Sequence, residues 1–494
     1  MTPLQSLLDH DRQTRALEQV MGRLRWDQEV MMPRGAAEQR AEEMAAMEAV
    51  VHARQCDPRV ADWLAAAETT IGAGNDADQA RLRQIRHEHS RRSRVPVDLA
   101  AEIARTVSLS HGIWAEARAR DDVAHFLPTL KRVVALKCEE AAALADGGDP
   151  YDALLQDYEP GATGAGIAAM FDRMRPRLRA LRDAARAAPG QPAPLLGEFD
   201  RDGQLRLARQ LAEVFGYDFA RGRLDMAVHP FSSGSGSDVR ISTRVVETDP
   251  FNCFYSTIHE VGHAAYEQNI DPAYALGPLG RGASMGVHES QARLYENQIA
   301  RSRPFCGWLF DRMRAEFGDF GLDGPDAFYA TVNRLAEGFI RTEADEVQYN
   351  LHIMLRFDLE RALIAGNLTV DDLEAAWNDR FAADFGYPVD RPAHGMLQDV
   401  HWSVGLFGYF PTYSLGNVYA GCLMAALRAD APDLDAALAA GDPGLATGWL
   451  REQVQVHGRL RTPRETIAAA CGHDPHEGPL LDYLEAKFRA IYAL

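Results

Sequence analysis

Apolar residues recur three or four positions apart over most of this chain, and this spacing commits it to helices. Residues 4–146 are rich in Ala, Arg, Glu and Leu and contain few glycines. Because the apolar side chains of such a segment fall on one face of a helix, the segment predicts several amphipathic helices. Met31, Met32 and Pro33 interrupt the pattern and predict a break before a new helix.

Glycine and proline divide the rest of the pattern into helices joined by loops. The predicted loops lie at residues 161–166, 188–197 and 271–286, and later turns lie near Pro325, Gly366 and Pro388. Residues 225–231 and 239–246 flank the segment SSGSGS, and the second flank is rich in β-branched residues. We expect a short β-hairpin there, in a chain that is otherwise mainly α.

The charge and the cysteines exclude some classes of protein. The 494 residues carry a formal net charge of −19, without a basic stripe that could bind nucleic acid. The N-terminal residues lack the pattern of a secretory signal, and no apolar run is long enough to cross a bilayer. The six scattered cysteines look like reduced thiols. We therefore expect a cytoplasmic protein without a nucleic-acid or membrane partner.

One motif stands out inside an apolar helical segment. His259, Glu260 and His263 form an H-E-x-x-H sequence, HEVGH, within FNCFYSTIHEVGHAAYE. Residues four apart share a face of a helix, so the two imidazoles can bind one metal ion while the glutamate points at the same site. The alternative is a pair of core histidines with satisfied hydrogen bonds. The motif indicates a metallopeptidase.

A catalytic zinc usually has three protein ligands and keeps one position for water, so HEVGH needs a third donor. Glu289 is our candidate, because it follows the glycine-rich loop that can lay a second helix against the first. His288 and Glu296 are the rivals. Glu260 is the expected general base, since a carboxylate beside a metal-activated water can take its proton and pass it to the leaving amine.

Further blocks occur along the chain in a fixed order around HEVGH. They are HPF at residues 229–231, DVRIS at 238–242, HESQ at 288–291, IRTEAD at 340–345 and GMLQDVHW at 395–402. Together with WDQEVMMPRGAAEQRAE near the N-terminus, they resemble the carboxypeptidase Taq family of metallocarboxypeptidases. One departure is that the family pattern D-x-R-x-T has Ser242 in its last place, with Thr243 just after it.

The resemblance implies an elongated multi-helical zinc-peptidase fold with a deep groove and one small β-sheet. It also implies a homodimer that removes single residues from peptide C-termini with broad specificity. His259, His263 and Glu289 would hold one divalent metal per subunit, with zinc expected and cobalt as the alternative. We expect one domain over residues 1–494, with a helical scaffold region at 1–200 and a motif-bearing catalytic region at 201–494.

An exopeptidase must recognise a free carboxylate, and a guanidinium binds one through two charge-assisted hydrogen bonds. Arg341 is the first candidate for this role and Arg240 the second. For each, the alternative is a structural ion pair, with Asp345 or Asp238 respectively. His229 is expected either to contact the substrate backbone or to anchor the hairpin.

The negative charge that develops on the scissile carbonyl oxygen also needs a hydrogen-bond donor. His401 and Tyr409 are our candidates, with Tyr413 as the runner-up, in a segment that resembles the equivalent region of related helical zinc peptidases. A tyrosine in such aromatic company is otherwise a core residue.

Some related peptidases place an aspartate four residues after the glutamate ligand to orient a histidine, but here that residue is Arg293. We expect Asp345 or Asp399 to supply the orienting carboxylate instead. Two other functions stay open: an oligopeptidase that cleaves internal bonds of short peptides, and an inactive homologue that only binds peptides. Cleavage of peptides with amidated C-termini would identify the oligopeptidase. Metal content together with turnover of a blocked dipeptide would identify an inactive binding protein.

Overall fold

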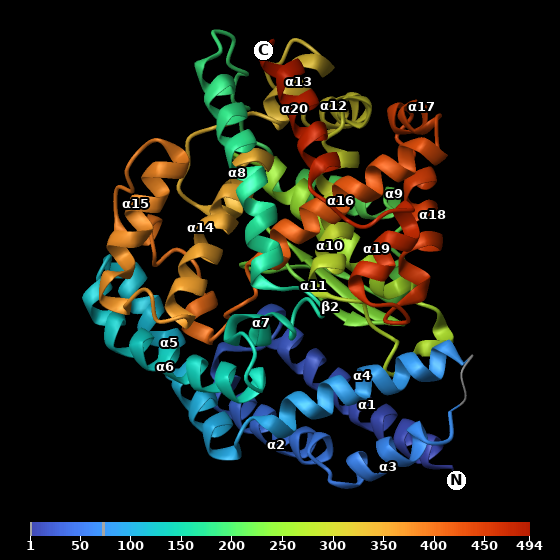
Figure 1. Ribbon diagram of the computed structural model, residues 1–494. Coiled ribbons are helices and arrows are strands. Elements are labelled where there is room, and N and C mark those ends of the chain that lie inside the picture. The colour runs from blue at the N-terminus through green and yellow to red at the C-terminus, as the bar shows by residue number, and fades with distance from the viewer. Residues whose placement is uncertain (1, 72–74) are drawn as a thin grey trace. The chain divides into compact units, whose positions relative to one another are not determined.

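The computed structural model of the protein describes residues 2–71 and 75–494 (Figure 1). Helices dominate this part of the chain, and its one sheet has three short strands. The expected mainly α fold with one small sheet is confirmed. Among the described helices, none has the length and apolar character needed to cross a bilayer.

The chain divides into two compact units, each made of three separate segments. Unit 1 comprises residues 1–93, 193–333 and 419–475, and unit 2 comprises residues 94–192, 334–418 and 476–494. Because segments from the whole length of the chain alternate between them, neither unit coincides with the expected regions 1–200 and 201–494. The single catalytic domain stays a prediction.

Unit 1 contains the sheet and most of the helices. Its α-helices are α1 (Pro3–Val30), α2 (Ala37–Gln55), α3 (Arg59–Glu68), α4 (Asp76–Arg94), α9 (Arg201–Val214), α10 (Pro250–Asn269), α11 (Met285–Arg293), α12 (Arg303–Phe317), α13 (Pro325–Val332), α17 (Leu434–Ala439), α18 (Gly444–Gln453) and α19 (Pro463–Cys471). Its shorter elements are the 3-10 helices η1 (Arg34–Ala36), η2 (Phe219–Arg221), η3 (Pro272–Tyr274) and η9 (Gln455–His457), and the π-helix η4 (Leu294–Ala300).

The described residues of unit 2 form helices joined by loops, without a strand. Its α-helices are α5 (Val97–Arg120), α6 (Val123–Ala145), α7 (Pro150–Leu155), α8 (Gly164–Ala187), α14 (Glu346–Ile364), α15 (Leu373–Phe385) and α20 (Gly478–Tyr492). Its 3-10 helices are η5 (Arg341–Glu343), η6 (Val370–Asp372), η7 (Pro392–His394) and η8 (His401–Val404). The helix α16 (Pro411–Asp430) begins in unit 2 and ends in unit 1.

The first helix ends where its sequence predicts. Pro3 occupies its first turn, where a missing backbone N–H costs nothing, and the Thr2 hydroxyl accepts a hydrogen bond from the Gln5 backbone N–H at 3.2 Å. The helix stops at Val30, and Pro33 precedes the start of the next turn. The predicted break at Met31–Pro33 is therefore confirmed.

The sheet differs from the expected hairpin in its strand arrangement. Its strands β1 (Leu224–Met226), β2 (Ser232–Ser235) and β3 (Asp238–Thr243) have the order β1-β3-β2. The SSGSGS segment, expected to be the loop, forms β2 itself and pairs antiparallel with β3, while β1 pairs parallel with β3. The turn shrinks to Gly236 and Ser237, because Gly236 has a φ of +63° that a tight hairpin requires.

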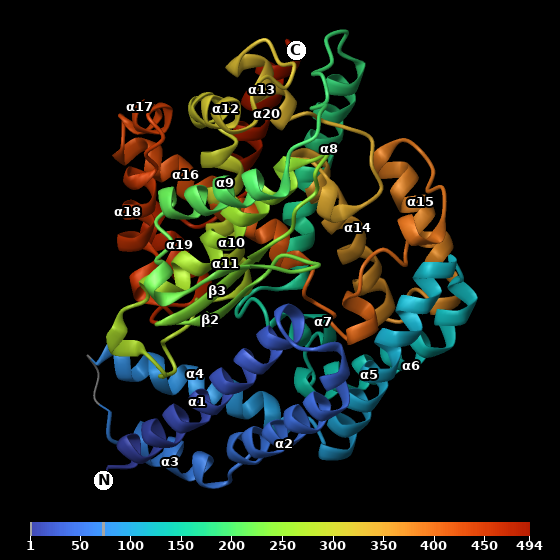
Figure 2. The same ribbon diagram turned by 180° about the vertical axis from the view of Figure 1, so that it is seen from behind.

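Helix α10 lies at the centre of unit 1. It packs against β2 and β3 on one side and against α9, α11 and η4 on others, as Figure 2 shows for the sheet and α11. Fourteen of its residues are buried, including Tyr255, Ile258 and Tyr266 at helical spacing. A helix surrounded in this way has few conformational alternatives, so side chains that it carries are held firmly.

The glycine-rich loop before α11 is fastened to α10. The Ala283 N–H donates to the Tyr266 hydroxyl at 3.0 Å, and the Gly282 N–H donates to Glu267 Oε1 at 3.0 Å. A Cβ on Gly282 would lie only 2.7 Å from the His288 ring. The loop therefore returns the chain against α10, as expected, and Ser284 then caps α11.

Gly262, the glycine of HEVGH, permits the close packing of α11 on α10. A Cβ at this position would lie 2.5 Å from the Cα of Ala292 and 2.9 Å from the Gln291 carbonyl oxygen. Real side chains do not approach a backbone so closely, so the two helices can lie this near each other only because residue 262 has no side chain.

We predict that Gly262→Ala lowers the free energy of unfolding by about 1–3 kcal/mol, because the added methyl group must push two helix backbones apart. Urea denaturation followed by circular dichroism measures this. The matched control is Gly22→Ala in α1, where a Cβ would meet nothing within 4 Å. It should gain up to ~1 kcal/mol from the better helix propensity of alanine. Equal stabilities of the two variants would contradict the packing argument.

Candidate metal centre

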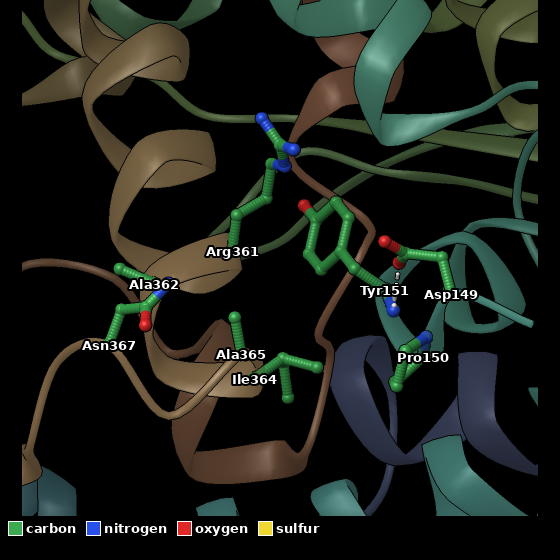
Figure 3. Close-up of a pocket in the computed structure, with 8 residues that line it drawn as sticks. All are labelled: Asp149, Pro150, Tyr151, Arg361, Ala362, Ile364, Ala365 and Asn367. Carbon is green, nitrogen blue, oxygen red and sulfur yellow. Dashed lines mark hydrogen bonds between the residues drawn. The ribbon is translucent and has the colours of Figure 1, made fainter.

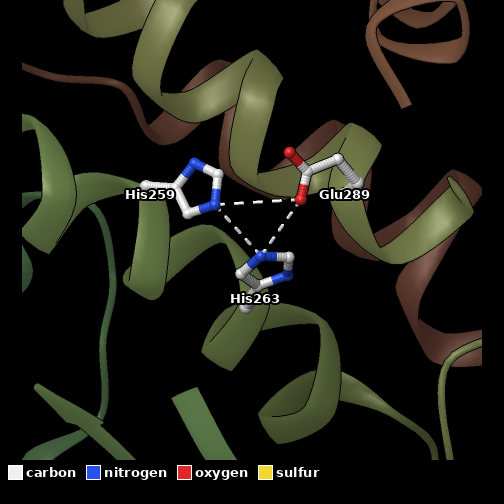
Figure 4. A group of neighbouring side chains, drawn as sticks. All are labelled: His259, His263 and Glu289. Atoms are coloured by element: carbon white, nitrogen blue, oxygen red, sulfur yellow. Dashed lines mark hydrogen bonds and ion pairs between the residues drawn. The ribbon is translucent and has the colours of Figure 1, made fainter. Parts of the chain in front are cut away.

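Two histidines project from one face of α10 and meet a glutamate of α11. The Nε2 atoms of His259 and His263 lie 3.2 Å apart. Glu289 brings its Oε2 atom to 3.4 Å from the His263 Nε2 and to 3.8 Å from the His259 Nε2. The three side chains converge from two helices on one point (Figure 4).

This triangle has the dimensions of a metal site. Tetrahedral ligation at about 2.0–2.1 Å separates ligand atoms by roughly 3.3–3.4 Å, close to the three distances in this site. Burial lowers the pKa of His263 to about 4, which keeps its imidazole neutral, as ligation requires. Atoms with lone pairs held this close need a proton or a cation between them, and a divalent metal can bind all three. The residues therefore fit a divalent metal.

The outer nitrogens of both imidazoles also have partners. His259 Nδ1 lies 2.9 Å from Glu296 Oε2. His263 Nδ1 lies 2.7 Å from His288 Nδ1, and His288 Nε2 lies 3.0 Å from Glu267 Oε1. One histidine is thus supported directly by a carboxylate, and the other through a second imidazole. Such partners fix the tautomer and the orientation of a ligating histidine.

These contacts revise the expected outer residues. Glu296 and His288, considered above as rivals for the third ligand, lie behind the two histidines. Asp345 and Asp399 make their hydrogen bonds to residues other than His259 and His263. The carboxylates that contact these histidines in the described chain are Glu296 and, through His288, Glu267. The sequence carried a signal for Glu267 that we did not use, since it lies four residues after His263 on the same helix.

An arginine lies between the two carboxylates of α11 and η4. Arg293 Nε donates to Glu289 Oε1 at 2.7 Å, and its Nη1 donates to Glu296 Oε2 at 3.4 Å. Arg301 pairs with the other oxygen of Glu296 at 3.2 Å. Burial would raise the pKa of both carboxyl groups, but the arginine and histidine charges outweigh it. The pKa of Glu289 therefore lies below its ordinary range, and that of Glu296 falls to about 2.

Glu260 has a different environment from the other carboxylates. Its side chain is buried, and it makes no hydrogen bond with the residues that the structure describes. Burial raises the pKa of Glu260 to about 7. A buried carboxylate next to His259 that has no competing hydrogen bond is available for proton transfer.

The two remaining predicted residues of unit 1 lie on or beside the sheet. Arg240 on β3 forms a two-pronged ion pair with Asp238, at 2.8 and 3.0 Å, and its guanidinium stacks 4.3 Å from the Trp26 ring centroid. Its structural alternative, the ion pair with Asp238, is therefore present. His229 is exposed in the loop between β1 and β2.

Ser242, where the sequence departs from the family pattern, is buried and holds the HPF segment. Its backbone N–H and its hydroxyl both donate to the Phe231 carbonyl, at 3.0 and 3.1 Å. The Phe231 N–H donates back to the Ser242 hydroxyl at 2.9 Å. A serine hydroxyl is therefore sufficient here, while Thr243 bonds to α10 through the Cys253 carbonyl at 3.1 Å.

Unit 2 contains the other predicted residues, and several of them are in contact. Arg341 is buried and donates to Asp399 Oδ1 from Nε and Nη2, at 3.1 and 3.0 Å. It also donates to the Tyr349 hydroxyl at 3.1 Å. Arg356 binds the other oxygen of Asp399, with Nε at 2.7 Å. The ion pair of Arg341 is thus with Asp399, and not with Asp345.

Asp345 serves the start of α14. Its Oδ1 accepts hydrogen bonds from the backbone N–H groups of Val347 and Gln348, both at 3.0 Å. This is the usual role of an aspartate at a helix N-cap. Asp345 therefore has a structural role that needs no substrate.

The oxyanion candidates form an aromatic cluster. His401 Nε2 lies 3.2 Å from the Tyr413 hydroxyl, and the Tyr409 ring lies 5.7 Å from the His401 ring centroid. Burial lowers the pKa of His401 to about 3, so the imidazole is neutral. A neutral imidazole can donate only one hydrogen bond, and here Nε2 either donates to Tyr413 or accepts from it.

The segment that carries these side chains is anchored by a buried carboxylate that the sequence reasoning missed. Glu360 of α14 accepts hydrogen bonds from Trp402 Nε1 at 2.8 Å, from the Gly408 N–H at 3.0 Å and from the Tyr151 hydroxyl at 2.9 Å. Burial raises the pKa of Glu360 to about 7. Glu360 lies in a regular helix, so no local sequence signal marks it.

A cavity of about 300 Å³ lies beside this anchor, at the end of α14 (Figure 3). It is lined by Asp149, Pro150, Tyr151, Arg361, Ala362, Ile364, Ala365 and Asn367. None of the residues predicted for metal binding or catalysis lines it.

Comparison with known proteins shows that the resemblance to the carboxypeptidase Taq family covers nearly the whole chain. The family model of the carboxypeptidase Taq (M32) metallopeptidases matches residues 6–488. Thermostable carboxypeptidase 1 of Thermus thermophilus is 38% identical with 100% of both chains covered, and carboxypeptidase 1 of Bacillus subtilis is 32% identical with 95% of each covered.

Solved structures agree with the family match. The crystal structure of the M32 carboxypeptidase from Deinococcus radiodurans R1 is similar with a TM-score of 0.96 and 37% identity, over 100% of both chains. Sequence and fold therefore agree along the full length of the chain and not only around HEVGH. The chain belongs to the carboxypeptidase Taq (M32) family, and it is a metallocarboxypeptidase.

Proposed function

We propose that this metallocarboxypeptidase holds one divalent metal per subunit between His259, His263 and Glu289 and removes single residues from peptide C-termini with broad specificity. The observation that carries the proposal is the triangle of three ligand atoms, none more than 3.8 Å from another. Two imidazoles and one carboxylate are the ligand set of many zinc peptidases, so zinc is the proposed metal and cobalt the alternative.

Glu260 is the proposed general base. The metal, when bound, supplies a Lewis acid for the scissile carbonyl and lowers the pKa of water. Glu260 would take a proton from the attacking water and return it to the leaving nitrogen. Its burial and its freedom from other hydrogen bonds in the described chain support this role.

Arg341 is the proposed receptor of the substrate carboxylate. A guanidinium has five N–H groups, and the bonds of Arg341 to Asp399 and Tyr349 use three of them. One N–H on each terminal nitrogen remains, which suits a two-pronged bond to a carboxylate. Arg240 stays the second candidate, although its bond to Asp238 already uses its two-pronged edge. His229 is exposed, and contact with the substrate backbone is proposed for it.

His401 and Tyr409 are the proposed donors to the developing oxyanion, with Tyr413 as the alternative. The contact between His401 and Tyr413 supports a shared role, because a bond from one hydroxyl fixes the direction of the ring. For Asp345 and Asp399, a role in orienting other side chains is proposed. The salt bridge of Asp399 to two arginines supports that role.

We also propose a homodimer in the cytoplasm. The dimer rests on the family resemblance alone. The cytoplasmic location is supported by the six cysteines, all of which are free.

We predict that Glu260→Gln abolishes turnover, by at least about 100-fold, because the proton acceptor is lost while the ligands remain. Hydrolysis of a blocked dipeptide and metal content by mass spectrometry are the measurements. Glu452→Gln, at a carboxylate on the surface of unit 1 whose side chain is 69% exposed, is the matched control and should keep full activity. Measurable hydrolysis by a fully metallated Glu260→Gln variant would count against the assignment.

Arg341→Ala is expected to raise the KM for a free-acid peptide by ~30-fold or more, because a lost charge-assisted pair costs about 2 kcal/mol or more. The inhibition constant of the C-terminal amide of the same peptide should change far less. Arg380→Ala removes another ion-paired arginine of unit 2 and should alter neither value. If acid and amide were affected equally, Arg341 would lose this role.

His288→Leu should weaken metal binding by about 10–100-fold, because His263 loses the partner that fixes its tautomer. His288→Gln keeps an oxygen that can accept from His263 and an N–H that can donate to Glu267, so its metal affinity should stay near that of the parent protein. Competition with a chromophoric chelator measures both affinities. Equal losses in the two variants would mean that the ring only fills space.

A further inference from the structure

Arg293 is placed where it can control how Glu289 binds the metal. Its side chain is only 14% exposed, and it contacts the ligand glutamate and the glutamate behind His259. It lies one helical turn after Glu289, so the contact is built into α11. The environment is enclosed, which strengthens a charge-assisted hydrogen bond.

The two carboxylate oxygens of Glu289 have different partners. Oε2 faces the Nε2 atoms of His259 and His263, at 3.8 and 3.4 Å. Oε1 accepts a hydrogen bond from Arg293 Nε at 2.7 Å. For Oε1 to turn toward the metal as a second ligand atom, this short bond between opposite charges would have to break.

We propose that Arg293 is a positioning residue that restricts Glu289 to ligation through Oε2 alone. This inference rests on the proposed ligand set of His259, His263 and Glu289. A carboxylate can bind a metal through one oxygen or two, and a second oxygen occupies a position that water or the substrate carbonyl needs. Arg293 thereby keeps coordination positions open for the reaction.

The neighbouring charges allow this role of Arg293 to be tested without a loss of folding stability. Glu296 has Arg301 as a second cationic partner, at 3.2 Å, and His259 as a third contact. Loss of Arg293 therefore leaves Glu296 paired and frees mainly Oε1 of Glu289. It also removes a positive charge beside the metal ligands, which should favour binding of a cation.

The test uses Arg293→Met, which removes the charge and the hydrogen bonds, and Arg293→Lys, which keeps the charge and one donor. Each full-length protein is loaded with Co²⁺, whose visible absorption falls as the coordination number rises from four toward six. We expect Arg293→Met to show a lower molar absorption than the parent protein and Arg293→Lys to show an intermediate or parental one. Co²⁺ affinity, measured by chelator competition, should be unchanged or higher in Arg293→Met, while kcat falls.

An unchanged spectrum in Arg293→Met would overturn the proposal. So would a metal affinity lowered by about 10-fold or more, which is the effect of a lost orienting group. If Arg293→Met fails to fold, Arg293→Leu, which also lacks a charge and a donor, takes its place with the same two outcomes.

A separate arm uses Glu289→Gln to test the ligand set itself. If this variant keeps the parental Co²⁺ affinity and spectrum, the proposed metal site fails. If it loses them while Arg293→Met leaves the spectrum unchanged, only the inference about Arg293 fails.

Discussion

The approach of α11 to α10 at Gly262 is the contact on which the proposed metal centre depends. HEVGH can supply only two ligands from its own helix, and the third must come from a backbone close enough for a glutamate to reach them. The Cα of Ala292 lies where a side chain on residue 262 would be. The bonds of Gly282 and Ala283 to α10 then fix the angle at which α11 arrives.

This geometry brings several ionisable groups into one enclosed space, where unpaired charges would be costly. The protein pairs these charges with opposite ones: each carboxylate around the two histidines lies beside an imidazole or a guanidinium. In unit 2 the same arrangement occurs where Asp399 lies between Arg341 and Arg356. Buried charges of both units are thus held in place by neighbours of opposite sign, which suits side chains that must keep a fixed direction.

Local patterns predicted much of this protein. The helical spacing, the break at Pro33 and the pairing of HEVGH with Glu289 all depend on residues near one another in sequence, or on a single loop. The sheet was predicted less well, because strand order depends on contacts that no local pattern encodes. The SSGSGS segment has the composition of a loop, but it forms a strand because β3 offers it backbone partners.

The supporting residues were the hardest to predict, for a physical reason. Charge alone could not distinguish Asp345 and Asp399 from Glu267 and Glu296 as partners near His259 and His263, because a hydrogen bond depends on direction and distance. Glu360 and Arg356 sit in an ordinary helical pattern, so only the folded structure reveals that their side chains turn inward to the segment carrying His401. The chain also passes back and forth between the two units, and no change in amino-acid composition along the sequence marks where it does so.

The passage of the chain between the two units affects folding during translation. Residues 259–296, which include the proposed metal ligands and their partners, leave the ribosome on the order of ten seconds before residues 419–475 do. Unit 1 cannot close before that later segment arrives, and unit 2 must wait for residues 476–494. Neither complete unit can therefore form until the C-terminal segments have been made. The nascent chain must keep its apolar helix faces from aggregating until both units can be finished almost together.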